Sequence, residues 1–151
     1  MDVGLSVSRV GGKTQAPVLR KAAGTLRLDY AQFLELEVFT RFGGMPDGRV
    51  RDQLTRGARI REALRQGQHV PLRLADEVAL MLAVQAGLLD ALPVGAVTAF
   101  RAALPAALDR DAADLLRGLT DTGTLEDKAR TDLLAVLATL AKSLGDTKTL
   151  A

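Results

Sequence analysis

Cysteine and tryptophan are absent from this sequence of 151 residues, and it contains a single histidine, His69. Without cysteine, the protein can form neither a disulfide nor a zinc site that uses thiolates. His69 lies in a predicted linker without a visible partner for a triad or a metal site, so we interpret it as a surface residue. Aromatic residues make up only 3% of the chain, whereas hydrophobic residues reach 48%. A core built mainly from Ala and Leu is typical of closely packed helices.

A strong charge of either sign is also lacking. The 20 basic and 18 acidic residues leave a net charge of +2, which is too small to indicate nucleic-acid binding. The most apolar run, 78–84, is too short to cross a bilayer, and the acidic start Met1-Asp2 is not followed by the apolar segment of a signal peptide. We therefore expect a soluble chain, without a nucleic-acid partner, that meets a membrane only indirectly.

Helical periodicity covers most of the chain, and we expect an all-α bundle of five to six helices. The segment 75–89 is apolar almost all round and should form the most buried helix, which 90–93 then breaks. The segment 29–42 also alternates like a strand, but its length and its lack of Gly and Pro favour a helix. The expected helices span about 17–23, 29–42, 49–66, 75–89, 94–119 and 124–145.

Three local signals refine these boundaries. Pro105 should kink or interrupt the helix that begins near residue 94. The segment from Thr124 to Asp127 has the pattern of a capping box that opens the last helix, and Gly145 fits its C-terminal stop.

The predicted helix at 49–66 carries most of its arginines on the face opposite its apolar stripe. One interpretation is a docking surface for an anionic partner. The other, which is the more common arrangement, is a solvated face whose arginine stems cover apolar surface. The residues concerned are Arg49, Arg51, Arg56, Arg59, Arg61 and Arg65.

The first twelve residues differ from the rest. In Val3–Gly12, apolar Leu5 and Val7 alternate with serines, which predicts a short extended segment that ends at a glycine pair. Gly12-Lys13-Thr14 has the ending of a P-loop, but Val7 stands where that motif needs its first glycine. The sequence therefore predicts no phosphate-binding loop here.

The stretch Val3-Gly4-Leu5-Ser6-Val7-Ser8-Arg9-Val10-Gly11-Gly12 resembles the end of the nucleotide-binding domain in the alpha subunit of F-type ATP synthases. The likeness continues through Ala23 to Phe33 and includes Phe42-Gly43, Leu54-x-Arg56-Gly57 and Gly87-x-Leu89-Asp90; beyond about Pro93 it is one of helical pattern only. The resemblance implies two parts. Residues 1–13 would be the end of the nucleotide-binding domain, and residues 14–151 the C-terminal helical domain of an alpha subunit.

In this family the alpha subunit alternates with beta around a rotating central stalk, and catalysis occurs on beta. The family's arginine finger lies in its Ser-Val-Ser-Arg element, here Ser6 to Arg9. The resemblance therefore implies that Arg9 reaches in trans to the γ-phosphate of nucleotide on beta, and it associates Ser6 with activity. A guanidinium suits this task because it presents a permanently charged fork to the phosphoryl oxygens. Without the resemblance, Arg9 is an ordinary surface charge at a strand end.

The resemblance also implies the setting. The fragment alone would be inactive and would hold no cofactor or metal, because ATP or ADP and Mg²⁺ belong to the full complex. Its partners would be the beta subunit and the central-stalk gamma subunit, in a peripheral complex on the cytoplasmic face of a bacterial plasma membrane that couples ATP synthesis to H⁺ or Na⁺ transport. The alternative function is a free-standing helical interaction module that binds an acidic protein or nucleic acid through its arginine-rich helix.

Some segments depart from the family pattern. The loop Gly43-Gly44-Met45-Pro46-Asp47 replaces the usual acidic, Ser- and Asp-bearing loop near the central stalk, and Lys13-Thr14, Pro17 and the Leu- and Ala-rich end also differ. We interpret these departures as the mark of a divergent, second-copy alpha subunit of the kind that some bacteria carry.

Overall fold

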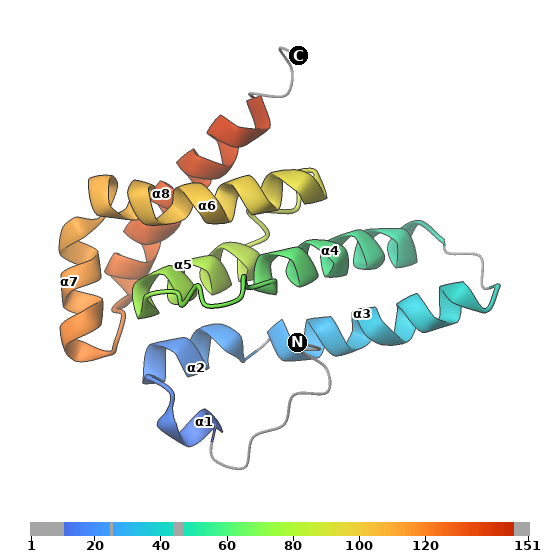
Figure 1. The fold of residues 1–151 in the computed structure, drawn as a ribbon, viewed down its shortest axis with the longest axis horizontal. Coiled ribbons are helices and arrows are strands. Elements are labelled where there is room, and N and C mark those ends of the chain that lie inside the picture. The colour runs from blue at the N-terminus through green and yellow to red at the C-terminus, as the bar shows by residue number, and fades with distance from the viewer. Residues whose placement is uncertain (1–10, 25, 44–46, 147–151) are drawn as a thin grey trace.

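The computed structural model describes residues 11–24, 26–43 and 47–146, and every regular element among them is a helix (Figure 1). The predicted all-α class is confirmed. The described residues form two helices more than expected, because α1 adds a single turn and Ala112 separates α6 from α7. The helices are α1 (Gly11–Thr14), α2 (Pro17–Ala23), α3 (Leu26–Arg41), α4 (Gly48–Leu64), α5 (Leu74–Gln85), α6 (Val94–Asp111), α7 (Ala113–Thr122) and α8 (Asp127–Asp146).

Helix α5 lies at the centre of the arrangement. It contacts α2, α3, α4, α6, α7 and α8, and in Figure 1 it occupies the middle of the bundle, with α2 on one side and α6 on the other. The prediction that this segment forms the most buried helix is therefore confirmed. The fully buried Val78, Ala79 and Ala83 have small side chains, and small side chains let neighbouring helix backbones approach closely on several sides.

A glycine in a left-handed conformation ends α5. Gly87 has φ +70, and its N–H donates to the Val84 carbonyl while the N–H of Leu88 reaches back to Ala83 (3.1 and 3.0 Å). These bonds satisfy carbonyls that the end of the helix leaves without a donor. The helix thus stops before the segment 90–93 that the sequence suggested as its break.

Helices α3 and α4 form an antiparallel hairpin that extends beyond the rest of the bundle (Figure 1). The carboxylate of Asp47 caps α4 by accepting from the N–H of Val50 at 2.8 Å, which satisfies an otherwise unpaired amide. Between the two helices, Gly57 of α4 lies against the ring of Phe33. The hairpin joins the bundle through contacts of α4 with α6.

The turn before α8 is hydrogen-bonded to the start of α2. The N–H of Val18 at the start of α2 donates to the carbonyl of Gly123 at 3.2 Å. Gly123 itself has φ +64 and ends α7 in a left-handed cap. Since α2 also packs on α5, both ends of the described chain meet around the central helix.

Two boundary predictions are wrong and a third is wrong in part. Pro105 does not interrupt α6, which continues through it, because the buried Phe100 and Leu104 before it and Leu108 after it anchor both halves of the helix in the core. The predicted capping box does not form: α8 begins at Asp127, and the Thr124 hydroxyl instead donates to the Thr122 hydroxyl at 3.0 Å. Gly145 does not stop α8, which runs on to Asp146.

Candidate functional site

The predicted catalytic residues, Arg9 and Ser6, lie outside the described residues, so their role stays a prediction. The predicted extended segment likewise falls mostly outside them. Its described end, Gly11 to Lys13, is helical rather than extended, and Gly12 accepts a 3.2 Å hydrogen bond from Arg20. The Thr14 hydroxyl donates to the Gly11 carbonyl at 3.0 Å. Two carbonyls of this turn therefore accept hydrogen bonds from side chains.

The arginine-rich face of α4 is largely engaged within the molecule. Arg56 Nη1 lies 2.5 Å from Asp90 Oδ2 in the turn after α5. Its Nη2 lies 3.8 Å from Asp29 Oδ2 of α3 and donates to the Val84 carbonyl at 3.4 Å. One guanidinium thereby connects three helices. Two of the short motifs quoted in the sequence analysis, Arg56-Gly57 and Gly87-x-Leu89-Asp90, lie next to each other here. Their contact joins the α3–α4 hairpin to the end of α5.

Arg61 makes the second connection between α3 and α4. Its Nη1 and Nη2 donate to the two carboxylate oxygens of Glu37 at 2.9 and 2.6 Å, and its Nε donates to the Tyr30 hydroxyl at 3.3 Å. The guanidinium carbon also stands 4.7 Å from the centre of the Phe33 ring, within range of a cation–π interaction. Hydrogen bonding from Arg61 lowers the pKa of Glu37, and the same bonds raise the pKa of Arg61. Both groups therefore stay charged at neutral pH.

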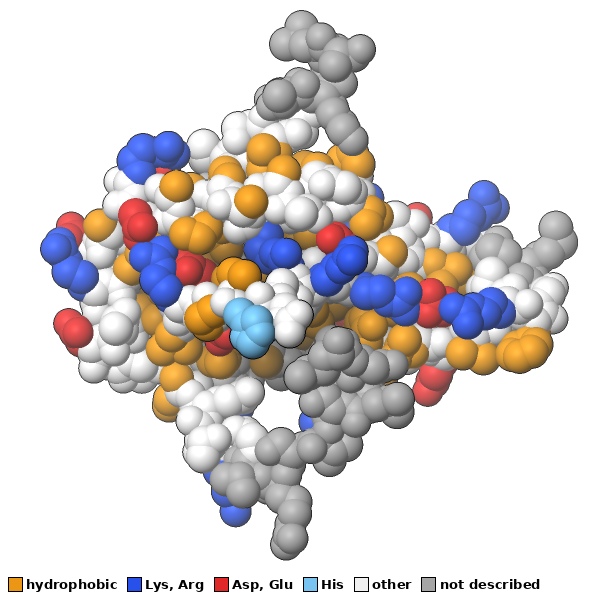
Figure 2. All heavy atoms as spheres, in the orientation of Figure 1, with side chains coloured by type: hydrophobic (Ala, Val, Ile, Leu, Met, Phe, Trp, Pro, Cys, Tyr) orange, Lys and Arg blue, Asp and Glu red, His pale blue; other side chains and the backbone are white. Residues whose placement is uncertain are grey.

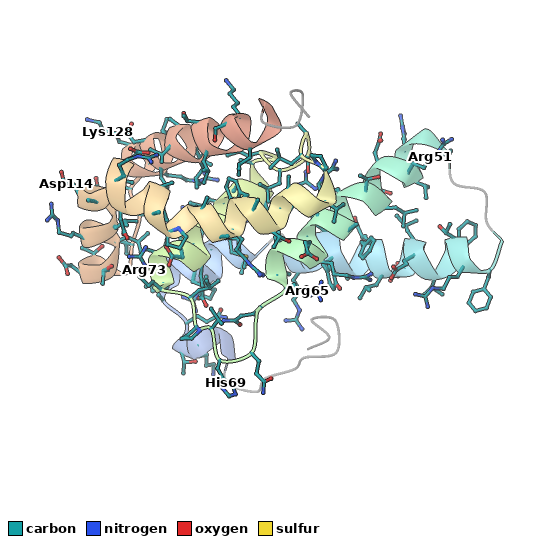
Figure 3. The ribbon with its side chains drawn as sticks, turned by 45° about the horizontal axis from the view of Figure 1, so that its top comes forward. Arg51, Arg65, His69, Arg73, Asp114 and Lys128 are labelled. Carbon is teal, nitrogen blue, oxygen red and sulfur yellow. The ribbon has the colours of Figure 1, made fainter. Side chains whose placement is uncertain are left out.

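Two further arginines, Arg59 within α4 and Arg65 directly after it, also have partners within the molecule. Arg59 donates to the carbonyl of Leu92 at 2.7 Å, and Arg65 lies 3.6 Å from Glu62. Figure 3 shows Arg51 at the far end of the hairpin and Arg65 near the bundle. Four of the six predicted docking arginines thus hold partners within the same molecule, which weakens the interpretation of this face as an anionic docking surface.

A separate ion-pair cluster lies at the start of α5. Arg73 holds Asp76, the one charged residue among the buried side chains that the structure describes, through two hydrogen bonds of 2.9 Å. Arg73 Nη1 also donates to Asp109 of α6 at 2.8 Å. Burial, followed by the charge of Asp76, raises the pKa of neighbouring Glu77. Figure 3 places Arg73 beside the loop that carries His69. We interpret the cluster as structural, because each hydrogen bond is internal.

His69 occupies an exposed loop and has φ 60, as expected of a surface residue in a tight turn. Figure 3 shows it pointing away from the bundle. Among the described residues, no group of three His, Asp or Glu side chains could hold a metal ion. In that same part of the chain, no buried side-chain nitrogen or oxygen lacks a hydrogen-bond partner, so no buried polar group points to a missing ligand.

One groove of about 310 Å³ opens between α2, α5 and the start of α8. Its floor is formed by apolar side chains such as Val18 and Leu82, and Lys21 and Arg130 also line it. It holds no carboxylate or histidine for acid–base chemistry. The groove therefore indicates no reaction.

Sequence reasoning missed the acidic partners of these arginines. Asp29, Glu37 and Asp90 come from other elements, so only the fold brings them to α4. The pair of Arg73 and Asp76 was missed as well, although a spacing of three residues at a helix start is a recognisable signal.

Comparison with known proteins gives a consistent result. A model of the family described as "ATP synthase alpha/beta chain, C terminal domain" matches residues 15–140. The chain is 52% identical to ATP synthase subunit alpha 3 of Paraburkholderia xenovorans (strain LB400) over 142 residues, which cover 94% of this chain and 27% of that protein. It is 50% identical to ATP synthase subunit alpha 2 of Gluconobacter oxydans (strain 621H) over 137 residues, or 91% of this chain and 27% of that protein. The chain thus spans about a quarter of the length of these curated relatives.

Proposed function

This chain belongs to the family formed by the C-terminal domains of ATP synthase alpha and beta subunits, and from that premise we propose that it is the C-terminal helical part of an alpha subunit of a rotary ATP synthase. The observation that carries this proposal is the 52% identity over 94% of the chain to a protein named as an alpha subunit. The helical fold and the Arg56–Asp90 junction agree with it. Because the relatives carry the numbers 2 and 3 in their names, we also propose a second-copy form.

We propose that Arg9 supplies the arginine finger to the nucleotide bound on a neighbouring beta subunit, with Ser6 supporting the same element. The support is the Ser6-Val7-Ser8-Arg9 motif and its glycine-flanked setting. Charge spreads over the phosphoryl oxygens in the transition state, and a guanidinium neutralises it. Such fingers are worth roughly 10³–10⁵ in rate, or about 4–7 kcal/mol.

The proposed partners are the beta subunit and the central-stalk gamma subunit, with ATP or ADP and Mg²⁺ bound elsewhere in the complex. The complex would be peripheral, on the cytoplasmic face of the plasma membrane. Among the described residues, no helix is long and apolar enough to span a bilayer. The proposal therefore has the chain reach the membrane only through other subunits.

The free-standing interaction module receives less support. It needs the arginines of α4 for an external anion, but Arg56, Arg59 and Arg61 each contact a group within the same molecule at 2.5–2.9 Å. Steep salt dependence of binding to DNA or RNA would revive this alternative.

A chimeric alpha subunit tests the proposal in its working context. Residues of the Paraburkholderia alpha subunit that match this chain are replaced by the present sequence, and the chimera is co-expressed with the other subunits of that complex. We expect co-purification with beta and multisite ATP hydrolysis well above background. The isolated chain should show no hydrolysis, because in the proposed function catalysis occurs on the beta subunit.

Substitutions in the chimera then test the finger. Arg9→Ala should reduce multisite turnover by about 10³-fold or more while nucleotide binding persists, because the finger acts on the transition state. Arg117→Ala is the matched control, since Arg117 is an exposed arginine of α7 whose ion pair is with Asp114. Unchanged turnover in Arg9→Ala would remove the finger assignment, and failure of the chimera to bind beta would remove the subunit assignment.

A further inference from the structure

The groove between α2, α5 and the start of α8 joins an apolar floor to two cationic side chains. Val18 and Ala22 of α2 and Leu82 of α5 contribute to the floor, and all three side chains are buried. Lys21 of α2 and Arg130 of α8 line the same groove and are exposed. Figure 1 shows α2 against α5, and α8 also packs on α5. Three segments far apart in the sequence therefore build one amphipathic groove.

Neither cation of the groove is paired with a carboxylate in the part of the chain that the structure describes. Figure 2 shows Asp and Glu side chains interspersed with Lys and Arg over the face that it draws. The lining of the groove is different, because its described residues include neither Asp nor Glu. Within the same part of the chain, no ion pair engages Lys21 or Arg130. The positive charge of the groove therefore favours an anionic ligand.

The size of the groove limits that ligand to a small molecule. Its volume of about 310 Å³ lies at the lower end of the range of about 300–1,000 Å³ that is usual for small-molecule sites. This volume suits one short alkyl chain better than the two long chains of a phospholipid. A mostly apolar lining with a few polar groups is also typical of such sites. The ligand should therefore combine a short apolar body with an anionic head.

The two cations suit a carboxylate as that head. The guanidinium of Arg130 is a planar fork whose N–H groups match the two oxygens of a carboxylate. The ammonium group of Lys21 is a compact charge on a flexible stem, so it can donate from several directions. Because the two side chains belong to different helices, a carboxylate bound by both would connect α2 to α8.

We propose that this groove binds a medium-chain fatty acid, with the alkyl chain on the floor that includes Val18 and Leu82 and the carboxylate held by Lys21 and Arg130. The bound molecule would hold α2, α5 and α8 together, alongside the hydrogen bond from the N–H of Val18 to the carbonyl of Gly123. The proposal does not rest on the proposed function, since it uses only residues that line the groove.

Octanoate is the probe, and isothermal titration calorimetry measures its binding to the full chain. Octan-1-ol has a similar alkyl chain without the charge, and octylamine carries the opposite charge. We expect octanoate to bind at least tenfold more tightly than either. Hexanoate tests the apolar floor, because each methylene group that becomes buried should strengthen binding by about fourfold. Octanoate should therefore bind about tenfold more tightly than hexanoate.

Variants of the protein locate the binding site. The double change Lys21→Gln and Arg130→Gln should weaken octanoate by about tenfold or more, because it removes both charge-assisted contacts. Lys21→Glu with Arg130→Glu should reverse the preference, so that octylamine becomes the tighter ligand. The matched control is Lys128→Gln with Lys142→Gln, which also removes two positive charges, from exposed positions of α8 that do not line the groove. Its affinity for octanoate should match that of the unchanged protein.

Thermal unfolding gives a second measurement. A ligand that binds only the folded chain raises its stability as the ligand concentration rises. Octanoate should therefore raise the Tm of the unchanged protein and of the Lys128 and Lys142 control, but not that of the double glutamine variant of Lys21 and Arg130. All four substituted residues are exposed, so circular dichroism without ligand should show unchanged folding.

Several results would overturn the proposal. They are equal binding of octanoate, octan-1-ol and octylamine, an affinity that does not change from hexanoate to octanoate, and full affinity in the double glutamine variant. Vesicles of phosphatidylglycerol separate a free fatty acid from a membrane surface. Sedimentation with these vesicles, without binding of octanoate, would make a lipid headgroup the ligand. None of these results would affect the hydrolysis and co-purification tests, so the two proposals can fail separately.

Discussion

Gly57 on α4 lies directly against Phe33 on α3, so close that a Cβ at position 57 would overlap the atoms Cβ, Cγ and Cδ2 of that side chain. Phe33 is 4% exposed, and the guanidinium carbon of Arg61 stands 4.7 Å from the centre of its ring. This contact sets the separation of the two helices in the hairpin.

Gly57→Ala should therefore destabilise the domain by about 3 kcal/mol, because the added methyl group overfills a packed contact. Thermal or urea unfolding followed by circular dichroism measures the change. Gly118→Ala is the matched control: Gly118 lies within α7 with open space around its missing Cβ, so alanine should stabilise by about 0.5–1 kcal/mol. Equal effects at the two positions would show that helix propensity, and not the Phe33 contact, decides the result.

Arg73→Ala should cost about 2 kcal/mol, because it leaves the buried carboxylate of Asp76 without the two hydrogen bonds that it now accepts. Arg73→Lys should recover only part of this loss, since an ammonium group cannot supply the two-pronged contact. The double change Arg73→Ala and Asp76→Ala should lose less than the two single changes added together. Strict additivity in this urea-unfolding cycle would argue against the pairing.

Arg56 and Asp90 should be energetically coupled across the junction of α4 with the end of α5. Their contact is 2.5 Å long but partly exposed, with side-chain exposures of 33% and 42%. We therefore expect a coupling of about 0.5–1 kcal/mol from a double-mutant cycle with Arg56→Ala and Asp90→Ala. The coupling should shrink in 1 M salt, where exposed charges are screened. A coupling energy of zero at low salt would contradict a stabilising role for the Arg56–Asp90 contact.

The pH dependence of stability should show the contribution of Glu37. Its pKa is lowered in the folded chain by hydrogen bonding from Arg61, so the unfolded chain binds more protons in the interval between the two pKa values. Stability therefore rises with pH across that interval. The contribution is complete above the ordinary glutamate pKa of about 4.3 and is lost as the pH falls below it. Glu37→Gln should lose stability at pH 7 and lose less at pH 3.

Glu77 should show the opposite sign. Burial, then the charge of Asp76, raises its folded pKa, so the folded chain binds more protons in the interval above about 4.3. Its charged form therefore opposes folding as the pH rises through that interval. The free energy of unfolding of Glu77→Gln, measured relative to the unchanged protein, should be higher at pH 7 than at pH 4. A variant that follows the unchanged protein at both pH values would contradict this assignment.

The sequence predicted the helices well where apolar spacing was regular. Residues 75–89 are apolar almost all round, and the corresponding α5 is the central helix. The helical pattern of 29–42 correctly predicted α3. Prediction failed where tertiary packing overruled a local signal. Pro105 removes one backbone donor but does not break a helix whose two halves are both anchored in the core. Thr124 does not cap α8, because that helix begins at Asp127 and the Thr124 hydroxyl donates to Thr122 instead.

Prediction of the site was limited in a different way. Local spacing identified the arginines of α4 but not their partners, because Glu37, Asp90 and the Leu92 carbonyl come from other elements. Arg9 and Ser6 depend on the family resemblance, and the described residues do not test them.

The hydrogen bond from Val18 to Gly123 has a consequence for synthesis of the protein on the ribosome. Polypeptides emerge N-terminus first, so α2 and α5 are made well before the turn and the helix that complete their packing. Contacts between such distant segments form late, since a long loop must close first. Until α8 leaves the ribosome, one apolar side of α5 stays uncovered. We therefore expect nascent chains halted before residue 123 to bind chaperones that recognise apolar segments, and released full-length chains to bind them far less.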